Sequence, residues 1–409
     1  MNATSTPIRI MPPAMPNTPE MNDATSTDVA TRTRKPTGIV EVKGEAEVSK
    51  CICRRTPAVT IADHPARFGL PPAKSSSRRR ITMNDLNRSG QPIRVFVACD
   101  LPPSVQAVFV ERFGAVCNDG GGILSRDDVL AGVQDKDVLV VTATDRLDSD
   151  LVAQLPSTVK AVCTYSIGME HLAIDALKAR GIAVMATPDV LSESCADVAL
   201  LLMLGAARRV IESSALVRSG QWAGWTARQL LGVDVWGRRL GILGMGRIGR
   251  AIAKRARGFD MEIHYHNRSR LAPELEVGAT YHADLAVLAA HSDFLCVACP
   301  SNADTRGSVN ADIIARLPPG AIVCNIARGD IIDDEALVAA LESGAVAAAG
   351  LDVFAGEPDI HPAYRSLPNV FGLPHIGSST EGTRVAMARL LCDGLDAYFS
   401  GRDPVNRVA

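Results

Sequence analysis

The stretch Gly244-Met245-Gly246-Arg247-Ile248-Gly249 decides the fold that this sequence predicts. The apolar run before it, residues 240–243, is typical of a buried parallel strand, and residues 248–256 after it have helical character. In such a strand–turn–helix unit the first glycine permits a tight turn, the second lets a ligand approach the backbone, and the third lets helix and strand pack closely. Because the first N–H groups of the helix are free and carry partial positive charge, the unit predicts a site for the pyrophosphate of a dinucleotide.

The end of the next strand, expected at residues 261–265, indicates which dinucleotide binds. An NAD site usually carries Asp or Glu there, about 20 residues past the glycines, to hold the ribose 2′-OH. This sequence reads His266-Asn267-Arg268-Ser269-Arg270, with two arginines and no carboxylate. Since a guanidinium binds phosphate in a forked, charge-assisted geometry, we predict NADP(H) over NAD(H), with Arg268 as the main discriminator and Ser269 or Arg270 assisting. The alternative interpretation is a solvated basic turn.

Composition and charge are those of an ordinary globular protein. The 409 residues are 47% hydrophobic with a net charge of −2, which is enough chain for two domains and predicts neither a nucleic-acid nor a membrane partner. No uninterrupted apolar run reaches the ~18 residues of a membrane helix. The cysteines are scattered through apolar runs, which indicates buried free thiols and a reducing, cytoplasmic compartment. Cys51-Ile52-Cys53 has no second Cys/His pair, so no metal site is expected.

The first 82 residues differ from the rest. They hold 10 of the 24 prolines, with 13 basic and 7 acidic residues and no sustained hydrophobic periodicity. Low hydrophobicity combined with Pro, Ser and charge predicts a disordered tail, which we place at residues 1–90. An alternative hypothesis is that Met83 is the true start of the protein.

From residue 93 onward, strand-like and helix-like segments alternate, which predicts an α/β fold. Strands are expected at residues 95–99, 137–142, 159–164 and 182–185 before the glycine motif, and at 294–298, 321–325, 347–352 and 370–373 after it. We therefore expect two doubly wound parallel-sheet domains: a flavodoxin-like substrate domain (residues 91–190 and 376–409) and a Rossmann-like NADP domain (residues 191–375). A long helix at residues 192–219 would link them, and a last helix at 380–399 would cross back. Trp222 and Trp225 are expected to pack between domains or subunits.

Three polar residues stand directly after predicted strands, where parallel sheets bind their ligands: Arg328, Glu357 and His375. When a hydride reaches a carbonyl carbon, a proton must reach the oxygen, and histidine is the natural donor near neutral pH. A neighbouring carboxylate, Glu357, would orient the ring, and Arg328 would bind the carboxylate of an α-keto acid. Each residue alone has an ordinary interpretation, as a core histidine, a surface arginine or a solvated turn glutamate. Their joint placement favours catalysis.

Four motifs, in this order, resemble those of the D-isomer-specific 2-hydroxyacid dehydrogenase family: Gly-Met-Gly-Arg-Ile-Gly (244–249), Asn-Ile-Ala-Arg-Gly-Asp (325–330), Gly-Leu-Asp-Val-Phe-x-Gly-Glu-Pro (350–358) and Pro-His-Ile-Gly (374–377). The match spans residue 93 to the C-terminus. The resemblance implies that Arg328 binds substrate and that Glu357 supports His375 as proton donor and acceptor. It also implies that Asp352 contacts the nicotinamide carboxamide and that backbone N–H groups near Ile167 and Gly168 hold the substrate carboxylate. His171, in the same loop, is interpreted as a structural residue.

The full set of expected cofactor contacts is Gly244, Gly246, Arg247, Ile248, Gly249, Asn267, Arg268, Ser269, Arg270, Pro300, Ile326, Ala327, Asp352 and Gly377. Within the family, the Asn-Arg-Ser-Arg turn resembles the NADPH-preferring glyoxylate/hydroxypyruvate reductases and the related 2-ketogluconate reductases. This implies a homodimeric reductase of small 2-keto acids, with NAD(H) as the weaker cofactor. Two alternatives stay open: a 2-ketoaldonate reductase, and a non-catalytic, nucleotide-sensing protein like the corepressors of this fold. Asp197 and Cys195 depart from the Glu and Thr common in the family.

Overall fold

The computed structural model describes residues 90–409, which belong to one compact unit. The predicted tail, Met83 and the Cys51-Ile52-Cys53 segment lie outside the described residues. Within residues 90–409, no helix is long and apolar enough to cross a membrane. In the same range no group of three or more His, Cys, Asp or Glu side chains is placed to hold a metal ion.

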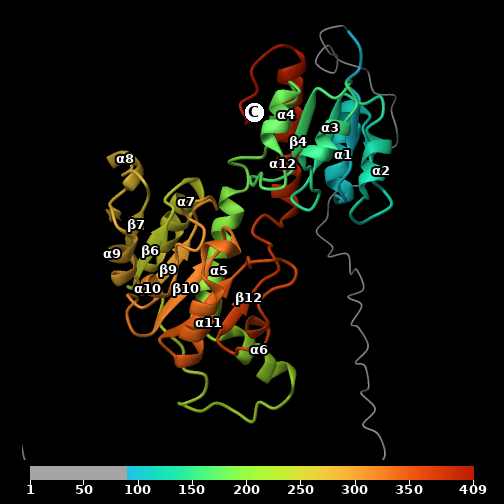
Figure 1. Cartoon of the computed structure of the whole chain (residues 1–409). Helices are drawn as coiled ribbons and strands as arrows, with labels where there is room; N and C mark the ends of the chain where they lie inside the picture. The colour runs from blue at the N-terminus through green and yellow to red at the C-terminus, as the bar shows by residue number, and fades with distance from the viewer. Residues whose placement is uncertain (1–89) are drawn as a thin grey trace, which may run out of the picture. The chain divides into compact units, whose positions relative to one another are not determined.

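The first part of the described chain forms a five-stranded parallel sheet with the order β2-β1-β3-β4-β5, the flavodoxin-like order. Figure 1 shows this part of the chain in blue and green. Its strands are β1 (Val95–Val97), β2 (Val116–Cys117), β3 (Val138–Val141), β4 (Ala161–Thr164) and β5 (Ala183–Met185). Its helices are α1 (Pro103–Phe113), α2 (Arg126–Gly132), α3 (Ser149–Gln154) and α4 (Ile174–Ala179). Apart from the edge strand β2, the strands are short and buried on both faces, as expected for a parallel sheet covered by helices.

Helix α12 (Glu381–Phe399) comes last in the sequence but packs on this first sheet. Met387, Leu391 and Leu395 join Val105 and Phe109 of α1 in one buried cluster. The C-terminal residues then close the edge beyond β5, since the N–H of Val184 donates to the carbonyl of Ala409 at 2.9 Å. The chain therefore returns to the first sheet after completing the second.

The second sheet has seven parallel strands in the order β12-β11-β10-β9-β6-β7-β8. The strands are β6 (Arg239–Leu243), β7 (Glu262–His266), β8 (Thr280–Tyr281), β9 (Phe294–Val297), β10 (Ala321–Asn325), β11 (Val346–Leu351) and β12 (Val370–Gly372). The chain leaves β6 toward β7 and β8 on one side and then returns to β9 on the other, so β6 and β9 flank the topological switch point. Ligands of doubly wound sheets bind outside the carboxyl ends of strands at that point, and the glycine turn follows β6 there. The predicted fold class of two parallel-sheet α/β domains is confirmed.

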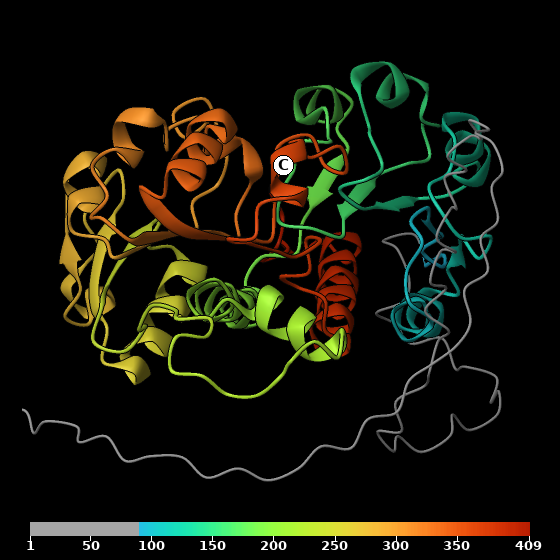
Figure 2. The ribbon, with the colours of Figure 1, turned by 90° about the horizontal axis from the view of Figure 1, so that it is seen from below.

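Helices cover both faces of the second sheet (Figure 2). They are α5 (Ser192–Ala207) and α7 (Arg247–Ala256) on one face, and α9 (Leu285–Ala290), α10 (Ala311–Ile314) and α11 (Asp334–Ser343) on the other. The alternation along β10 shows the two faces: Ile322 and Cys324 belong to the α5/α7 cluster, whereas Val323 belongs to the opposite one. A short helix, α8 (Pro273–Glu276), lies between β7 and β8.

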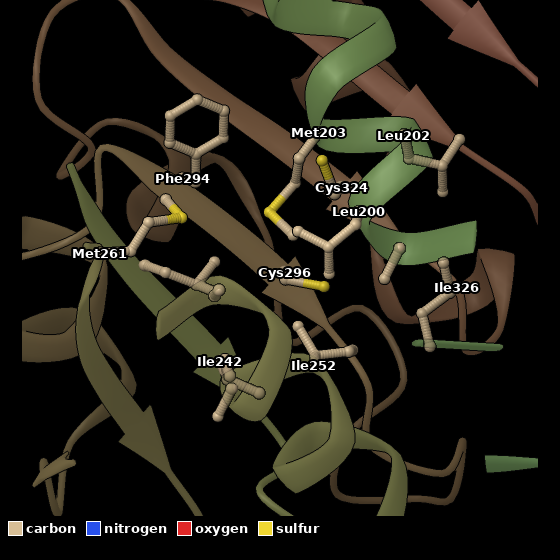
Figure 3. Packing of buried hydrophobic residues seen from close by; sticks show 14 of the residues in the cluster. Leu200, Leu202, Met203, Ile242, Ile252, Met261, Phe294, Cys296, Cys324 and Ile326 are labelled. Carbon is tan, nitrogen blue, oxygen red and sulfur yellow. The ribbon is translucent and has the colours of Figure 1, made fainter. Parts of the chain in front are cut away.

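Figure 3 shows the core between α5 and this sheet, where Leu200 and Met203 meet Phe294, Cys296 and Cys324. The two cysteines are free thiols in the sheet, as the sequence predicts. These side chains are almost fully removed from water, and burial of apolar surface stabilises a fold by about 25 cal/mol per Å². The core holds α5 against β10 and β11, and α5 also packs on α7, the helix that follows the glycine turn.

The prediction of a single long helix at residues 192–219 is wrong. The structure has two helices there, α5 and α6 (Val210–Arg218), separated by Arg209 in a left-handed conformation with φ +52°. The carbonyl of Ala207 accepts a hydrogen bond from the N–H of Val233 at 2.9 Å instead of continuing the helix. Arg209 then pairs with Glu212 in the first turn of α6, through contacts of 2.8 and 2.6 Å. A contact with a distant residue therefore ends α5, which apolar periodicity alone does not reveal.

Candidate active site

The glycine turn after β6 has the geometry of a phosphate-binding turn. Gly244 has φ +100°, and a Cβ there would lie 2.5 Å from the backbone N of Cys299. A Cβ on Gly249 would collide with the carbonyl oxygen of Gly244, so helix and turn pack in direct contact. At Gly246 nothing lies within 4 Å of the Cβ position, and α7 begins after it without a side-chain cap. Free N–H groups next to open space fit the pyrophosphate of a dinucleotide.

The loop after β7 holds four of the expected cofactor contacts, among them the three residues expected to recognise the 2′-phosphate, and the structure divides the four into two pairs. Asn267 Oδ1 accepts from the N–H of Met245 at 2.7 Å, so Asn267 ties this loop to the glycine turn. The side chain of Arg270 is already engaged, with its Nε 2.8 Å from Glu276 Oε1. Arg268 and Ser269 are exposed, and within residues 90–409 neither side chain makes a hydrogen bond or ion pair. These two are free to meet a ligand.

His375 and Glu357 form a pair at the carboxyl edge of the second sheet. His375 Nδ1 lies 2.9 Å from Glu357 Oε2, and Glu357 Oε1 accepts from the N–H of Phe354 at 2.7 Å. Burial raises the pKa of Glu357, but the hydrogen bonds from His375 and from the Phe354 N–H, with the charges of His375 and Arg328, outweigh it. The pKa of Glu357 is therefore lowered from its usual 4.5. An ionised Glu357 fixes the ring of His375 and leaves Nε2 for a substrate.

Asp352 supports the backbone of the same loop. Its carboxylate is 1% exposed and accepts from the N–H groups of Ile376 and Gly377, both at 2.8 Å. Its carbonyl accepts from the N–H of His375 at 2.8 Å, and His375 itself has φ +55°. Burial raises the pKa of Asp352 in spite of these hydrogen bonds. The contacts hold His375 in a conformation that a residue with a Cβ rarely adopts.

Arg328 follows β10 and lies against the loop between β4 and α4. Its Nε donates to Glu170 Oε1 at 3.3 Å, and its Nη1 donates to the carbonyl of Ala327 at 2.7 Å. A Cβ on Gly168 would collide with the guanidinium of Arg328, so a larger residue at position 168 would displace this side chain from its present position. His171, by contrast, shares a hydrogen bond of 2.9 Å with Thr164, and burial lowers its pKa. These contacts support the structural interpretation of His171.

A cavity of 1640 Å³ brings most of the predicted site together. The predicted residues that line it are Ile167, Gly168, Gly246, Arg247, Ile248, Pro300, Ile326, Ala327, Arg328, Asp352, Glu357, His375 and Gly377. Those outside its lining are Gly244 and Gly249, at the base of the glycine turn, and the loop residues Asn267, Arg268, Ser269 and Arg270. Arg247 also forms an ion pair with Asp189, another lining residue.

Sequence reasoning missed several polar residues of the same cavity: Thr142, Thr144, Glu170, Ser378, Ser379 and Arg384. The rule that found His375 would have found Thr142 and Thr144, because they follow β3 at its carboxyl end. Glu170 carries no such signal, since its relation to Arg328 exists only across two separate sheets.

The glycine turn lies at a topological switch point, beside a cavity that holds a histidine–carboxylate pair and an arginine. This combination defines an α/β enzyme that uses a nicotinamide dinucleotide. Residues 200–377 match the family model described as "D-isomer specific 2-hydroxyacid dehydrogenase, NAD binding domain". The chain belongs to the D-isomer-specific 2-hydroxyacid dehydrogenase family.

Curated relatives and solved structures agree with this assignment. The chain is 39% identical over 312 residues to the glycerate dehydrogenase of Hyphomicrobium methylovorum. The aligned region covers 76% of this chain and 97% of the relative. It is 42% identical over 271 residues to glyoxylate/hydroxypyruvate reductase B of Pectobacterium atrosepticum, covering 66% of this chain and 84% of that one. The solved NADPH-dependent glyoxylate/hydroxypyruvate reductase of Sinorhizobium meliloti, in complex with NADP and malonate, has a TM-score of 0.70 at 35% identity, covering 78% of this chain and 97% of that chain.

Proposed function

We propose that this protein reduces small 2-keto acids of the glyoxylate and hydroxypyruvate type to D-2-hydroxy acids, and catalyses the reverse oxidation, with NADPH as the preferred reductant. The observation that carries this proposal is the meeting of His375, Glu357 and Arg328 in one cavity next to the glycine turn. The names of the relatives, glyoxylate/hydroxypyruvate reductase and glycerate dehydrogenase, support this substrate class.

The bound dinucleotide would supply the hydride that adds to the carbonyl carbon of the substrate. Arg328, together with the backbone N–H groups near Ile167 and Gly168, would bind the substrate carboxylate and fix its orientation. As the C=O double bond becomes a single bond, His375 Nε2 would give its proton to the oxygen. Glu357 would keep the imidazolium oriented through Nδ1. In the oxidation, His375 Nε2 would take the hydroxyl proton instead.

The test is a substrate panel of glyoxylate, hydroxypyruvate and 2-ketogluconate, each with NADPH and with NADH, followed through the absorbance of the reduced nicotinamide. We expect the highest kcat/KM with NADPH and one of the two smaller acids. Absence of turnover on every 2-keto acid would contradict the proposal and favour a nucleotide-sensing protein without catalysis.

The preference for NADPH is proposed from the end of β7. The sequence has no carboxylate there, and the structure leaves the guanidinium of Arg268 and the hydroxyl of Ser269 exposed beside the glycine turn. A charge-assisted hydrogen bond contributes about 1.5–3 kcal/mol, or roughly 10- to 150-fold in affinity. The substitution Arg268→Ala is therefore expected to lower kcat/KM with NADPH by about that factor and to leave the value with NADH unchanged. An unchanged ratio of the two values would refute the role of Arg268.

A 2-ketoaldonate reductase is the second candidate. The cavity wall carries the hydroxyl groups of Thr142, Thr144, Ser378 and Ser379, which are suited to a polyhydroxylated substrate. The same panel decides between the two, because a larger kcat/KM with 2-ketogluconate than with glyoxylate or hydroxypyruvate would favour this alternative. The chemistry at His375 would be the same.

A homodimer is also proposed. Large apolar side chains are exposed on α6 and on the segment after it, among them Val217, Trp225, Leu231 and Trp236. An apolar surface of this kind is typical of a protein–protein interface. Light scattering of the purified full chain would give the oligomeric state, and a monomer at micromolar concentration would contradict the proposal. The cytoplasmic location and the domain boundaries stay predictions.

A further inference from the structure

Behind the candidate 2′-phosphate loop lies a buried carboxylate that the proposed mechanism does not use. Glu276, the last residue of α8, is only 6% exposed. Its Oε1 accepts from the hydroxyl of Tyr265 at 2.6 Å and from Arg270 Nε at 2.8 Å. Its Oε2 accepts from Arg270 Nη2 at 3.0 Å. A buried charge requires partners of this kind, and here both carboxylate oxygens have them.

The contacts of Glu276 join β7 to the segment that follows it. The hydroxyl of Tyr265, a fully buried β7 residue, also accepts from the N–H of Leu271 at 3.0 Å. Arg257 Nη2 donates to the carbonyl oxygens of Glu276 at 3.1 Å and of Val277 at 2.8 Å. Arg257 therefore holds the main chain at the end of α8, and the carboxylate of Glu276 links the turn of residues 267–271 to β7.

The two arginines of the turn consequently have different surroundings. Arg270 forms an ion pair with Glu276 through two hydrogen bonds, and these, with the hydrogen bond from Tyr265, lower the pKa of Glu276 to about 2. Within the part of the chain that the structure describes, Arg268 has no such partner. The front of the turn is attached to the glycine turn through Asn267. Arg268 and Ser269 thus project from a turn that is fixed at both ends.

We propose that Glu276 is a positioning residue for recognition of the 2′-phosphate: by holding Arg270 and Tyr265 it fixes the turn that presents Arg268 and Ser269, without touching the cofactor itself. The inference rests on the proposed preference for NADPH. It assigns Arg270 to the support of the turn, whereas the sequence suggested a direct contact with the phosphate. Preorganised cationic groups bind an anion more tightly because less conformational entropy is lost on binding.

The competing arrangement is one in which Arg270 leaves Glu276 and binds the phosphate directly. The two arrangements predict different results for the same substitutions. If Glu276 and Arg270 act as one support, Glu276→Ala, Arg270→Ala and the double variant weaken 2′-phosphate binding to the same extent. If Arg270 binds the phosphate, Arg270→Ala weakens binding more than Glu276→Ala does. In that case Glu276→Ala, which frees Arg270, preserves or strengthens binding.

Calorimetric titration of the full chain tests this without any turnover, with 2′,5′-ADP as the probe for the 2′-phosphate and 5′-AMP as the matched probe that lacks it. We expect Glu276→Ala, Arg270→Ala and the double variant each to weaken 2′,5′-ADP binding by about tenfold and to leave 5′-AMP binding unchanged. The control Glu274→Gln changes an exposed carboxylate of the same helix and should affect neither probe. A merely structural role would lower the melting temperature and leave the ratio of the two affinities at the wild-type value.

The inference is overturned if Glu276→Ala keeps the wild-type affinity ratio, or if Arg270→Ala alone weakens 2′,5′-ADP binding. Should Glu276→Ala fail to fold, Glu276→Gln carries the same test, since it keeps the size and part of the hydrogen bonding while removing the charge. Failure of the proposed function is seen separately, in the wild-type protein. If wild type binds 5′-AMP as tightly as 2′,5′-ADP, the NADPH preference is wrong and Glu276 has no phosphate site to position.

Discussion

His375 Nδ1 lies 2.9 Å from Glu357 Oε2, although the two residues come from different loops, one after β12 and the other after β11. The neighbouring parallel strands β11 and β12 end at the same edge of the sheet and bring the side chains together. Because Nδ1 is occupied by the carboxylate, Nε2 is the nitrogen available for proton transfer. The pairing thus decides which atom of the imidazole does the chemistry.

Substitution His375→Ala should abolish most of the turnover without affecting cofactor binding. A positioned general acid contributes about 10²- to 10⁴-fold, so kcat should fall by that factor. The dissociation constant of NADPH, measured by titration, should stay at the wild-type value. His291→Ala, which removes an exposed histidine outside the cavity lining, is the control and should leave kcat unchanged. Loss of NADPH binding in His375→Ala would instead indicate a structural role.

Glu357 should make the stability of the protein depend on pH. Its pKa in the folded protein is lowered from 4.5, so its contribution is fully present above pH 4.5 and is lost as pH falls through the folded-state pKa. Since solvent screens a carboxylate whose side chain is 34% exposed, we expect about 1 kcal/mol. The free energies of unfolding of wild type and Glu357→Gln, measured by urea denaturation, should differ above pH 4.5 and converge below it. A difference that grows toward acid pH would contradict this assignment.

The first two glycines of the turn should respond differently to the same added methyl group. Gly244→Ala combines an unfavourable φ of +100° with a collision against the backbone of Cys299, and should cost about 2 kcal/mol or more in stability. In Gly246→Ala the added methyl group meets open space, so the melting temperature of this variant should stay near that of wild type. Its cofactor affinity should nevertheless fall by about tenfold, because the methyl group enters the space that a pyrophosphate needs. Wild-type affinity in Gly246→Ala would show that the dinucleotide does not pass over this residue.

Glu170 and the substrate carboxylate should compete for Arg328. Glu170 accepts a hydrogen bond from Arg328 Nε at 3.3 Å, and its side chain is 51% exposed. A partly exposed ion pair contributes about 0.2–1 kcal/mol, so Glu170→Gln should lower the KM for the keto acid by up to about fivefold. Steady-state kinetics at saturating NADPH would measure this, with kcat expected to change little. A higher KM would mean that Glu170 orients Arg328 for the substrate and does not compete with it.

Much of the fold followed from local signals. Buried parallel strands appear in the sequence as short apolar runs bounded by turns. The first and third glycines of the turn after β6 occupy backbone positions where a side chain would collide with its neighbours. The boundaries of most strands therefore lie within one or two residues of the predicted ones, and the observed boundaries of β10 are the same as the predicted ones. The break at Arg209 was missed, because the contact that ends α5 comes from Val233. Local periodicity contains no information about such a partner.

The sequence by itself determined the kinds of group available: a glycine turn for a dinucleotide, a turn with arginines and no carboxylate, and an arginine, a glutamate and a histidine after strands. Only the tertiary structure decided which groups face one another. It pairs Glu357 with His375, sets Glu170 against Arg328 and engages Arg270 with the buried Glu276, leaving Arg268 free among the described residues. The reason is physical. Main-chain conformation and burial follow from neighbours along the chain, whereas hydrogen bonds and ion pairs between side chains depend on distances that the packing of whole sheets and helices sets.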